Sequence, residues 1–202
     1  MTGQPVGGRR IAPTWRALGA VVGLVLATAW ALTPGVAHAT LSEALSLDEL
    51  VRQSTLVLRV TCVGERTLLD DRSRIVMDYE LRVDEVVHGA SRAGETVTMR
   101  RLGGELGDLG MRIEGEPSLT PGSRYVVFLY AVNGLLRPVG MSQGVLPVST
   151  EAGALVVHPG GAGLALVQRG GGGQLVPAPP ALLHPEPWER LRERLDAVRG
   201  AP

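Results

Sequence analysis

Residues 75–84 show the most regular hydrophobic pattern in the chain, an alternation of apolar and charged side chains in which Val76 is the one exception. The apolar positions are Ile75, Met77, Tyr79, Leu81 and Val83, and the charged ones between them are Asp78, Glu80, Arg82 and Asp84. Successive side chains of a β-strand point to opposite faces, so this pattern predicts a long strand with a buried apolar face and a solvated charged face. The alternation breaks at residues 85–87, which predicts a β-bulge or bend before Gly89 ends the strand.

Similar patterns predict further strands at residues 56–63, 95–101, 124–130, 135–139, 145–148 and 154–157. Residues 124–130 are the most hydrophobic of these, and we expect them to be buried. Asn133-Gly134 predicts a type I′ turn, because both residues readily adopt positive φ angles. Cys62 has the same parity as the apolar residues before it, which places it in the core. The fold class is therefore all-β, a small antiparallel barrel or sandwich.

Two helices are predicted to flank the strands. Ser46-Leu-Asp-Glu49 is a capping box, so a short helix should run to about Gln53. At the other end, residues 187–199 form an amphipathic helix whose apolar side chains recur at helical spacing. These side chains are Trp188, Leu191, Leu195 and Val198. This helix either packs back on the β-domain or docks on a partner.

The first 39 residues are predicted to be an export signal. Arg9, Arg10 and Arg16 form a basic segment, residues 17–32 form an apolar run, and Ala37-His38-Ala39 has the form of a cleavage site. The run is shorter than the roughly 20 residues of a membrane-spanning helix, which favours cleavage over a permanent anchor. We therefore expect residues 1–39 to be removed and the protein to be periplasmic or extracellular.

The rest of the chain divides into a β-barrel domain at residues 40–158, a Gly- and Pro-rich linker at residues 159–184 and a C-terminal helix at residues 185–202. The signal carries three of the 20 basic residues and none of the 20 acidic ones, so the mature chain is mildly acidic. Aromatic residues make up only 3% of the sequence. Nucleic-acid binding is therefore not expected, because it needs a cationic surface and stacking platforms.

Residues 103–122 are predicted to be a long loop, with a short strand at residues 111–114. Ordering the backbone of so many residues costs roughly 1 kcal/mol or more per residue. A loop of this length is usually either disordered and without function or a surface that contacts a partner. We favour the second interpretation and predict that this loop contacts a partner through five residues: Glu105, Asp108, Met111, Arg112 and Ile113.

Catalytic and metal-binding motifs are weak. Gly140-Met-Ser142-Gln-Gly144 matches the G-x-S-x-G pattern of a serine-hydrolase nucleophile elbow. That elbow lies between a strand and a helix, whereas β-rich residues follow here. His88, His158 and His184 lack the close spacing of zinc ligands. We read the glycines around Ser142 as a turn and expect no metal or cofactor.

The order of these elements resembles a known fold. A short helix leads into Ser54-Thr-Leu-Val-Leu-Arg-Val-Thr-Cys62, and a charged loop separates this strand from Tyr79-Glu-Leu-Arg-Val-Asp-Glu-Val-Val-His-Gly89. A third strand and Arg124-Tyr-Val-Val-Phe-Leu-Tyr130 follow. Over about residues 46–150 this order resembles the netrin-like, OB-type barrel of tissue inhibitors of metalloproteinases, and also secreted bacterial proteins with the same strand pattern. The resemblance implies a small antiparallel OB-like barrel.

The resemblance does not extend to the inhibitory mechanism. Tissue inhibitors of metalloproteinases use an amino-terminal Cys-x-Cys, whose first residue chelates the target's zinc. The predicted mature start here is Thr40-Leu-Ser42. The sequence therefore favours a non-enzymatic exported β-barrel module that binds another exported protein, for which a protease is one candidate. The alternatives are a serine hydrolase that uses Ser142 and a structural envelope protein anchored by an uncleaved amino-terminal segment.

Overall fold

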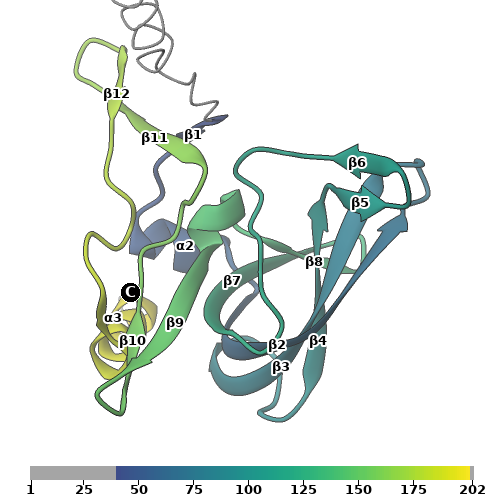
Figure 1. Ribbon diagram of the computed structural model, residues 1–202. Helices are drawn as coiled ribbons and strands as arrows, with labels where there is room; N and C mark the ends of the chain where they lie inside the picture. The colour runs from purple at the N-terminus through teal and green to yellow at the C-terminus, as the bar shows by residue number, and fades with distance from the viewer. Residues whose placement is uncertain (1–39, 201–202) are drawn as a thin grey trace, which may run out of the picture. The chain divides into compact units, whose positions relative to one another are not determined.

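The computed structural model of the protein describes residues 40–200. The predicted signal peptide, residues 1–39, and the last two residues lie outside the described part. The helical elements are α2 (Leu47–Gln53), the 3-10 helix η1 (Met141–Gly144) and α3 (Trp188–Gly200). The strands are β1 (Thr40–Glu43), β2 (Leu56–Leu69), β3 (Ile75–His88), β4 (Thr96–Leu102), β5 (Gly104–Leu106), β6 (Leu109–Met111), β7 (Arg124–Val132), β8 (Leu135–Pro138), β9 (Val145–Glu151), β10 (Ala154–Val157), β11 (Leu164–Arg169), β12 (Leu175–Pro177) and β13 (Glu186–Pro187) (Figure 1).

Eight strands form one sheet in the order β13-β10-β9-β7-β2-β3-β4-β8. Neighbouring strands are antiparallel except β4 and β8, which are parallel and share the single pair Met99 and Leu136. β8 also pairs antiparallel with β7. The turn between β7 and β8 is Asn133-Gly134, whose φ angles of 51° and 74° confirm the predicted turn. The predicted β-rich fold class is thus confirmed.

β2 and β3 form a long antiparallel ribbon, and β2 continues to Leu69 rather than ending at residue 63. Val57 pairs with His88 and Leu58 pairs with Val86, so Val87 is an extra residue in β3. This irregularity lies within residues 85–87 and confirms the predicted bulge. A further register shift makes Val63 an extra residue in β2.

The two faces of β3 differ, but not everywhere as predicted. Tyr79, Leu81 and Val83 are buried as expected. The prediction of a solvated charged face is wrong at Asp78, which is only 6% exposed. Its carboxylate accepts two hydrogen bonds from Arg100, at 2.6 and 2.7 Å. Arg100 is the direct cross-strand partner of Asp78 in β4, and this pairing allows the charge to be buried.

Two hydrophobic clusters lie on opposite faces of the sheet, because alternate residues of β2 and β7 point to opposite sides. Leu58, Val127 and Leu129 pack with the apolar face of β3. Their neighbours Val57, Val126 and Phe128 pack with the two α-helices. Cys62 belongs to the first cluster and is fully buried, as its parity predicts, and burial raises the pKa of its thiol.

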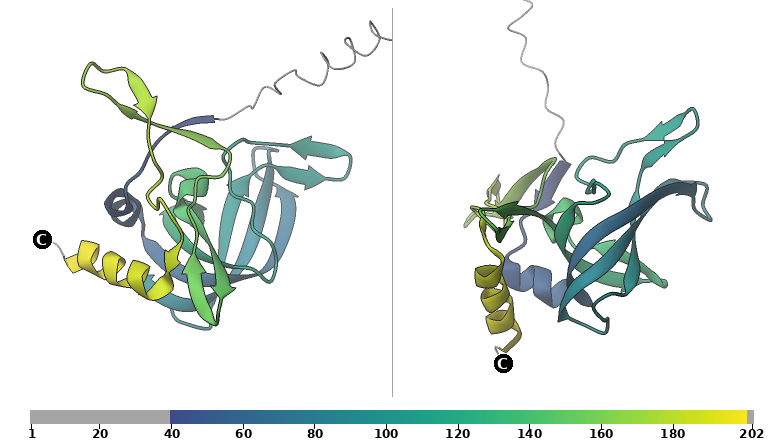
Figure 2. Two further views of the ribbon diagram at one scale, coloured as in Figure 1. Left: turned by 60° about the vertical axis from the view of Figure 1, so that its left-hand side comes forward. Right: turned by 60° about the horizontal axis from the view of Figure 1, so that its bottom comes forward.

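The two α-helices lie side by side against the second cluster (Figure 2). The capping box of α2 is confirmed: the Ser46 hydroxyl accepts from the Glu49 N–H at 3.3 Å, and the Glu49 carboxylate accepts from the Ser46 N–H at 2.7 Å. In α3, Trp188, Leu191 and Leu195 are at most 3% exposed. The C-terminal helix therefore packs on the β-domain, the first of its two predicted interpretations. Among residues 40–200, no helix is both long and apolar enough to cross a membrane.

The segment predicted as a linker, residues 159–184, contains two strands. β11 pairs in parallel with β1, and β12 pairs with β11, so the three strands form a small separate sheet (Figure 1). No residue of this sheet is buried. Its strands are short and lie between glycines, so the composition of this segment gives no strand pattern.

Candidate functional site

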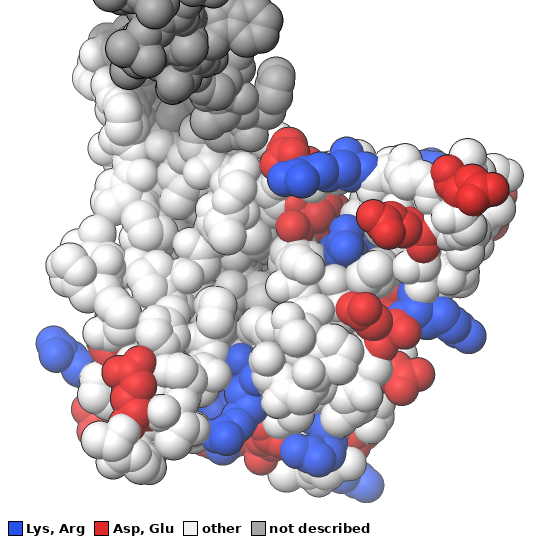
Figure 3. Space-filling view, in the orientation of Figure 1, with Lys and Arg blue, Asp and Glu red and all other residues white. Residues whose placement is uncertain are grey.

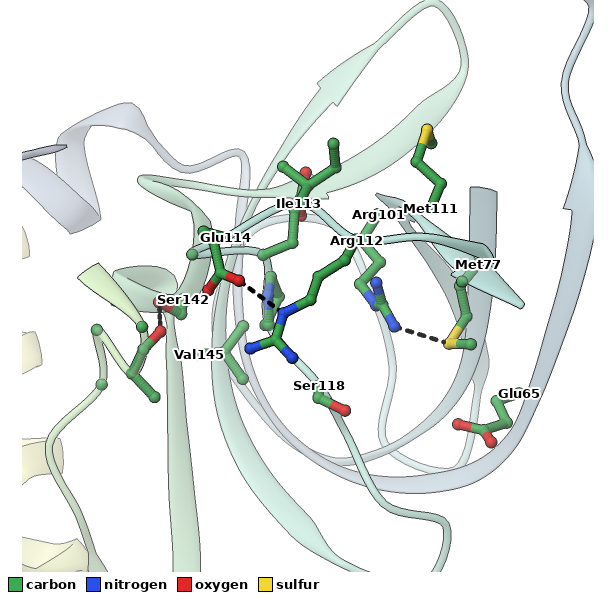
Figure 4. Close-up of a pocket in the computed structure, with 18 of the residues that line it drawn as sticks. Glu65, Met77, Arg101, Met111, Arg112, Ile113, Glu114, Ser118, Ser142 and Val145 are labelled. Carbon is green, nitrogen blue, oxygen red and sulfur yellow. Dashed lines mark hydrogen bonds and ion pairs between the residues drawn. The ribbon is translucent and has the colours of Figure 1, made fainter. Parts of the chain in front are cut away.

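A cleft with a volume of about 950 Å³ opens between the β2–β3 ribbon and the segment around η1 (Figure 4). Glu65 and Thr67 of β2, with Met77 of β3 and Arg101 of β4, line one side. Ser142 of η1 and residues 159–163 line the other side. The β5–β6 hairpin and residues 112–118 supply most of the remaining lining, and Tyr125 of β7 with Val145 and Pro147 of β9 completes it. The cleft thus joins segments that are far apart in the sequence.

Two glycines set the position of the β5–β6 hairpin. Gly103 and Gly104 have φ angles of 85° and 145°, which L side chains rarely adopt. A Cβ on Gly104 would lie 3.0 Å from Cγ2 of Thr67, so the hairpin crosses close to β2. The predicted short strand at residues 111–114 is therefore misplaced: the strand is β6, Leu109–Met111, which pairs with β5.

The structure brings four of the five predicted partner-binding residues to the cleft. Glu105, Met111, Arg112 and Ile113 all line it. Asp108 is exposed at the tip of the hairpin, between β5 and β6, and does not line the cleft. Leu109, beside this tip, is 64% exposed. The predicted residues therefore form one rim of a concave surface.

Acidic groups outnumber basic groups in the cleft. Its charged residues are Glu65, Glu105, Glu114, Glu116, Arg101 and Arg112. Figure 3 shows acidic and basic side chains intermixed on the part of the surface that carries β5 and β6.

Both arginines of the cleft are already held by the protein. The Arg112 Nε donates to Glu114 at 2.6 Å. The Arg101 Nε donates to the hydroxyl of Tyr79 at 3.1 Å, and its guanidinium lies over the Tyr79 ring, 5.8 Å from the ring centroid. Within residues 40–200, the carboxylates of Glu65 and Glu105 are in no salt bridge. The cleft therefore presents a surplus of negative charge.

Glu116 is the most enclosed of these carboxylates, with a side chain only 8% exposed. It accepts a 3.4 Å hydrogen bond from the backbone N–H of Leu102, and the guanidinium of Arg137 lies 3.9 Å away. Burial raises the pKa of Glu116, while the Leu102 N–H and Arg137 act in the opposite direction. At Leu102, β4 is paired only with β3, so the N–H of Leu102 has no strand partner on its other side. The carboxylate of Glu116 accepts from this N–H instead.

Ser142, the candidate nucleophile, occupies a different setting from a hydrolase elbow. It lies in a 3-10 helix that precedes strand β9, and its side chain is nearly buried. Its hydroxyl donates to the backbone carbonyl of Ala162 at 2.9 Å (Figure 4). The structure therefore gives this hydroxyl a local role, joining η1 to residues 159–163.

Of the three histidines within residues 40–200, His158 has the most polar surroundings. Its Nε2 lies 2.8 Å from the hydroxyl of Ser149 and 3.5 Å from the carboxylate of Glu151. Ser149 and Glu151 belong to β9, and His158 follows β10, so the three side chains cluster at a hairpin. In the part of the chain that the structure describes, no group of three or more His, Cys, Asp or Glu residues is arranged to hold a metal ion.

No protein-family model and no curated protein matches the sequence. The cleft is therefore the feature of this protein that points to a function. Sequence reasoning missed Glu65, Arg101 and Glu116, which come from β2, β4 and the end of the loop. The length of β2 was the one available signal, because a strand that continues past residue 63 carries Glu65 to the cleft.

Proposed function

We propose that this chain is an exported, non-enzymatic β-module that binds another protein through the cleft and the β5–β6 hairpin. Binding residues are commonly carried by loops that a rigid scaffold holds in place, as the sheet holds this hairpin. The single observation that carries the proposal is that Glu105, Met111, Arg112 and Ile113 line one cleft. These four residues are among those that the loop sequence predicts as partner contacts.

The strand pairings support an OB-type barrel as the fold of this module. β2 pairs with β3, β3 with β4, β4 with β8, β8 with β7, and β7 with β2, so each of the five strands has two neighbours within the set. A ring of five strands fits the OB-fold, which is a five-stranded, partly open barrel. The irregular register of β2 and β3 also fits a barrel, because bulges allow strands to bend. The netrin-like resemblance of residues 46–150 points to the same fold.

Export of the protein is supported by the amino-terminal sequence. A basic segment, an apolar run and Ala37-His38-Ala39 precede β1, which begins at Thr40. We propose that the partner is also exported, with a protease as one candidate. The amino-terminal Cys-x-Cys of metalloproteinase inhibitors is missing at Thr40-Leu-Ser42, so such a partner would be bound by another mechanism.

The test is capture of partners from the native cell envelope with the purified protein. Replacing residues 105–108 by Gly and Ser should weaken capture and leave the melting temperature nearly unchanged, because the hairpin tip is exposed. The matched control is the double variant Glu189→Ser and Glu193→Ser, which also removes two exposed carboxylates but on α3, outside the cleft. Undiminished capture by the hairpin variant, or loss of folding, would contradict the proposal.

A second experiment separates binding from hydrolysis. The purified protein is screened against esterase substrates together with Ser142→Ala. We expect no turnover that depends on Ser142, because its hydroxyl is engaged by Ala162. Hydrolysis that disappears in Ser142→Ala would establish the alternative function.

A further inference from the structure

The part of β2 beside the cleft has an open edge. β7 pairs with β2 only as far as Thr61, and Gly122 and Ser123, which lie just before β7 in the sequence, continue this contact at Cys62. Beyond the bulge at Val63, residues 64–69 pair with β3 alone. Among residues 40–200, no strand pairs with the other side of these residues, although β5 crosses near the side chain of Thr67. An open strand edge presents unpaired backbone N–H and C=O groups and can pair with another chain.

The direction of the free backbone groups follows from the register. The N–H of Asp70 donates to the carbonyl of Arg74, so this pair bonds directly across the ribbon. Bonded and non-bonded pairs alternate along an antiparallel ladder. Residues 68, 66 and 64 therefore bond to β3, whereas the backbone groups of Glu65, Thr67 and Leu69 point to the open side.

The side chains at this edge face the cleft. Glu65 and Thr67 are two residues apart, so they share one face of the strand, and both line the cleft. Figure 4 shows the carboxylate of Glu65 pointing from β2 toward the cleft interior. A chain that paired with this edge would thus have alternate side chains in the cleft, where carboxylates outnumber guanidinium groups and Arg101 and Arg112 are already engaged.

We propose that an extended, basic segment of the partner protein adds to β2 as a strand along residues 64–69, with a Lys or Arg side chain against Glu65. The inference rests on the proposed function and specifies its mode of recognition. Main-chain hydrogen bonds to Glu65, Thr67 and Leu69 supply affinity, and the acidic cleft selects the side chains. Opposite charges on directly paired residues of adjacent strands stabilise such a pair.

The same charges disfavour pairing between two copies of this protein. Two β2 edges side by side would bring Glu65 of each copy into one short ladder, where like charges repel. Charged residues on edge strands commonly prevent self-association. A basic segment is instead attracted by Glu65, so the edge can discriminate between a basic partner and a second copy of this protein.

The inference is tested with synthetic peptides and the full exported protein. The probe is a fluorescent peptide of alternating lysine and valine, compared with one of alternating glutamate and valine. A third peptide keeps the lysines but carries N-methyl groups on the amides that would face β2. We expect the lysine peptide to bind and the glutamate peptide not to bind. N-methylation should weaken binding about tenfold or more, because it removes hydrogen bonds and not charge. Equal binding of the lysine peptide and its N-methylated form would overturn the inference.

Variants of the protein locate the site. Thr67→Pro removes an N–H on the open side and leaves the pairing with β3 intact, so it should weaken binding of the lysine peptide about tenfold. Glu65→Gln should weaken binding mainly at low salt, because its contribution is screened. The Glu189→Ser and Glu193→Ser variant should bind as the unmodified protein does. A folded Thr67→Pro variant with unchanged affinity would overturn the inference, and if it does not fold, the N-methylated peptide decides.

The peptide experiment and the capture experiment test different claims, so either can fail while the other succeeds. If the hairpin variant loses capture but the lysine peptide does not bind, the cleft remains the binding site and strand addition is refuted. If the lysine peptide binds at β2 but the hairpin variant captures partners normally, strand addition stands and the role of the hairpin is refuted.

Discussion

Asp78 and Arg100 place opposite charges where water has little access. Their bidentate hydrogen bonds join two opposite charges on side chains that are only 8% exposed, for Asp78, and 18% exposed, for Arg100. The pair raises the pKa of Arg100, because the charged form of its side chain is stabilised by Asp78. Removing one member of such a pair costs more than the pair contributes, because the other charge stays buried without a partner.

We therefore predict that Asp78→Ala lowers the free energy of unfolding by about 3 kcal/mol. The control is Glu80→Ala, two residues along the same strand and exposed, which should change it by less than about 0.5 kcal/mol. Urea denaturation of both variants measures the difference. Equal effects would show that Arg100 finds another partner or reaches solvent when Asp78 is absent.

Glu116 leads to a prediction about pH. Burial raises the pKa of its carboxyl above the ordinary value of 4.5, so the folded protein holds the proton to higher pH than the unfolded chain does. The stability of the protein relative to Glu116→Gln is therefore full below about pH 4.5 and falls as the pH rises through the folded pKa. Denaturation of both proteins between acid and neutral pH measures this difference. A constant difference would mean that Arg137 and the Leu102 N–H fully offset the burial.

At the scale of the element, β3 separates buried from exposed positions within one residue. Leu81 is fully buried, whereas Arg82 is exposed. Leu81→Asp would bury an unpaired carboxylate and is expected to cost several kcal/mol, enough to unfold the domain. Arg82→Asp should change stability little, although its 3.4 Å contact with Asp84 would become repulsive. Similar melting temperatures for the two variants would mean that the faces are assigned incorrectly.

The elements that the sequence predicted are those whose pattern is local. β3, the capping box of α2 and the Asn133-Gly134 turn each follow from a few neighbouring residues, and each lies where it was expected. The burial of Asp78 depends on Arg100 in another strand, and β11 depends on pairing with β1, so neither could be recognised locally. The cleft contains residues of both kinds. The residues of its hairpin rim were predicted from the composition of the loop, whereas Glu65 could not be predicted, because it reaches the cleft only through the pairing that extends β2.

At the scale of the whole molecule, Glu85 connects α3 to the β2–β3 ribbon. Its carboxylate accepts hydrogen bonds from Arg59, from the indole of Trp188 and from Arg192. Arg59 also lies over the Trp188 ring, 5.5 Å from its centroid. Near the end of α3, Arg199 donates to the backbone carbonyl of Val87. Polar contacts thus reinforce the apolar packing of this helix along most of its length.

The two hydrophobic clusters should unfold together, because they share strands. Alternate residues of β2 and β7 belong to different clusters. If α3 separated from the sheet, it would therefore expose the face that carries Val57, Val126 and Phe128. Trp188 is the only tryptophan within residues 40–202, so in a protein of these residues its fluorescence reports on the helical side, whereas far-ultraviolet circular dichroism reports mainly on the sheet. We predict that both signals change at the same urea concentration, as in a two-state transition.

Leu195→Ala tests this cooperativity. Leu195 is fully buried on α3, so its truncation should cost about 2–5 kcal/mol. Because the clusters are coupled, both signals should shift to lower urea concentration by the same amount. Leu183→Ala, at a position that is 63% exposed, is the control and should shift neither signal appreciably. If the tryptophan signal moves alone, α3 and its cluster form a separate unit, and the C-terminal helix is free to detach while the sheet that carries the cleft stays folded.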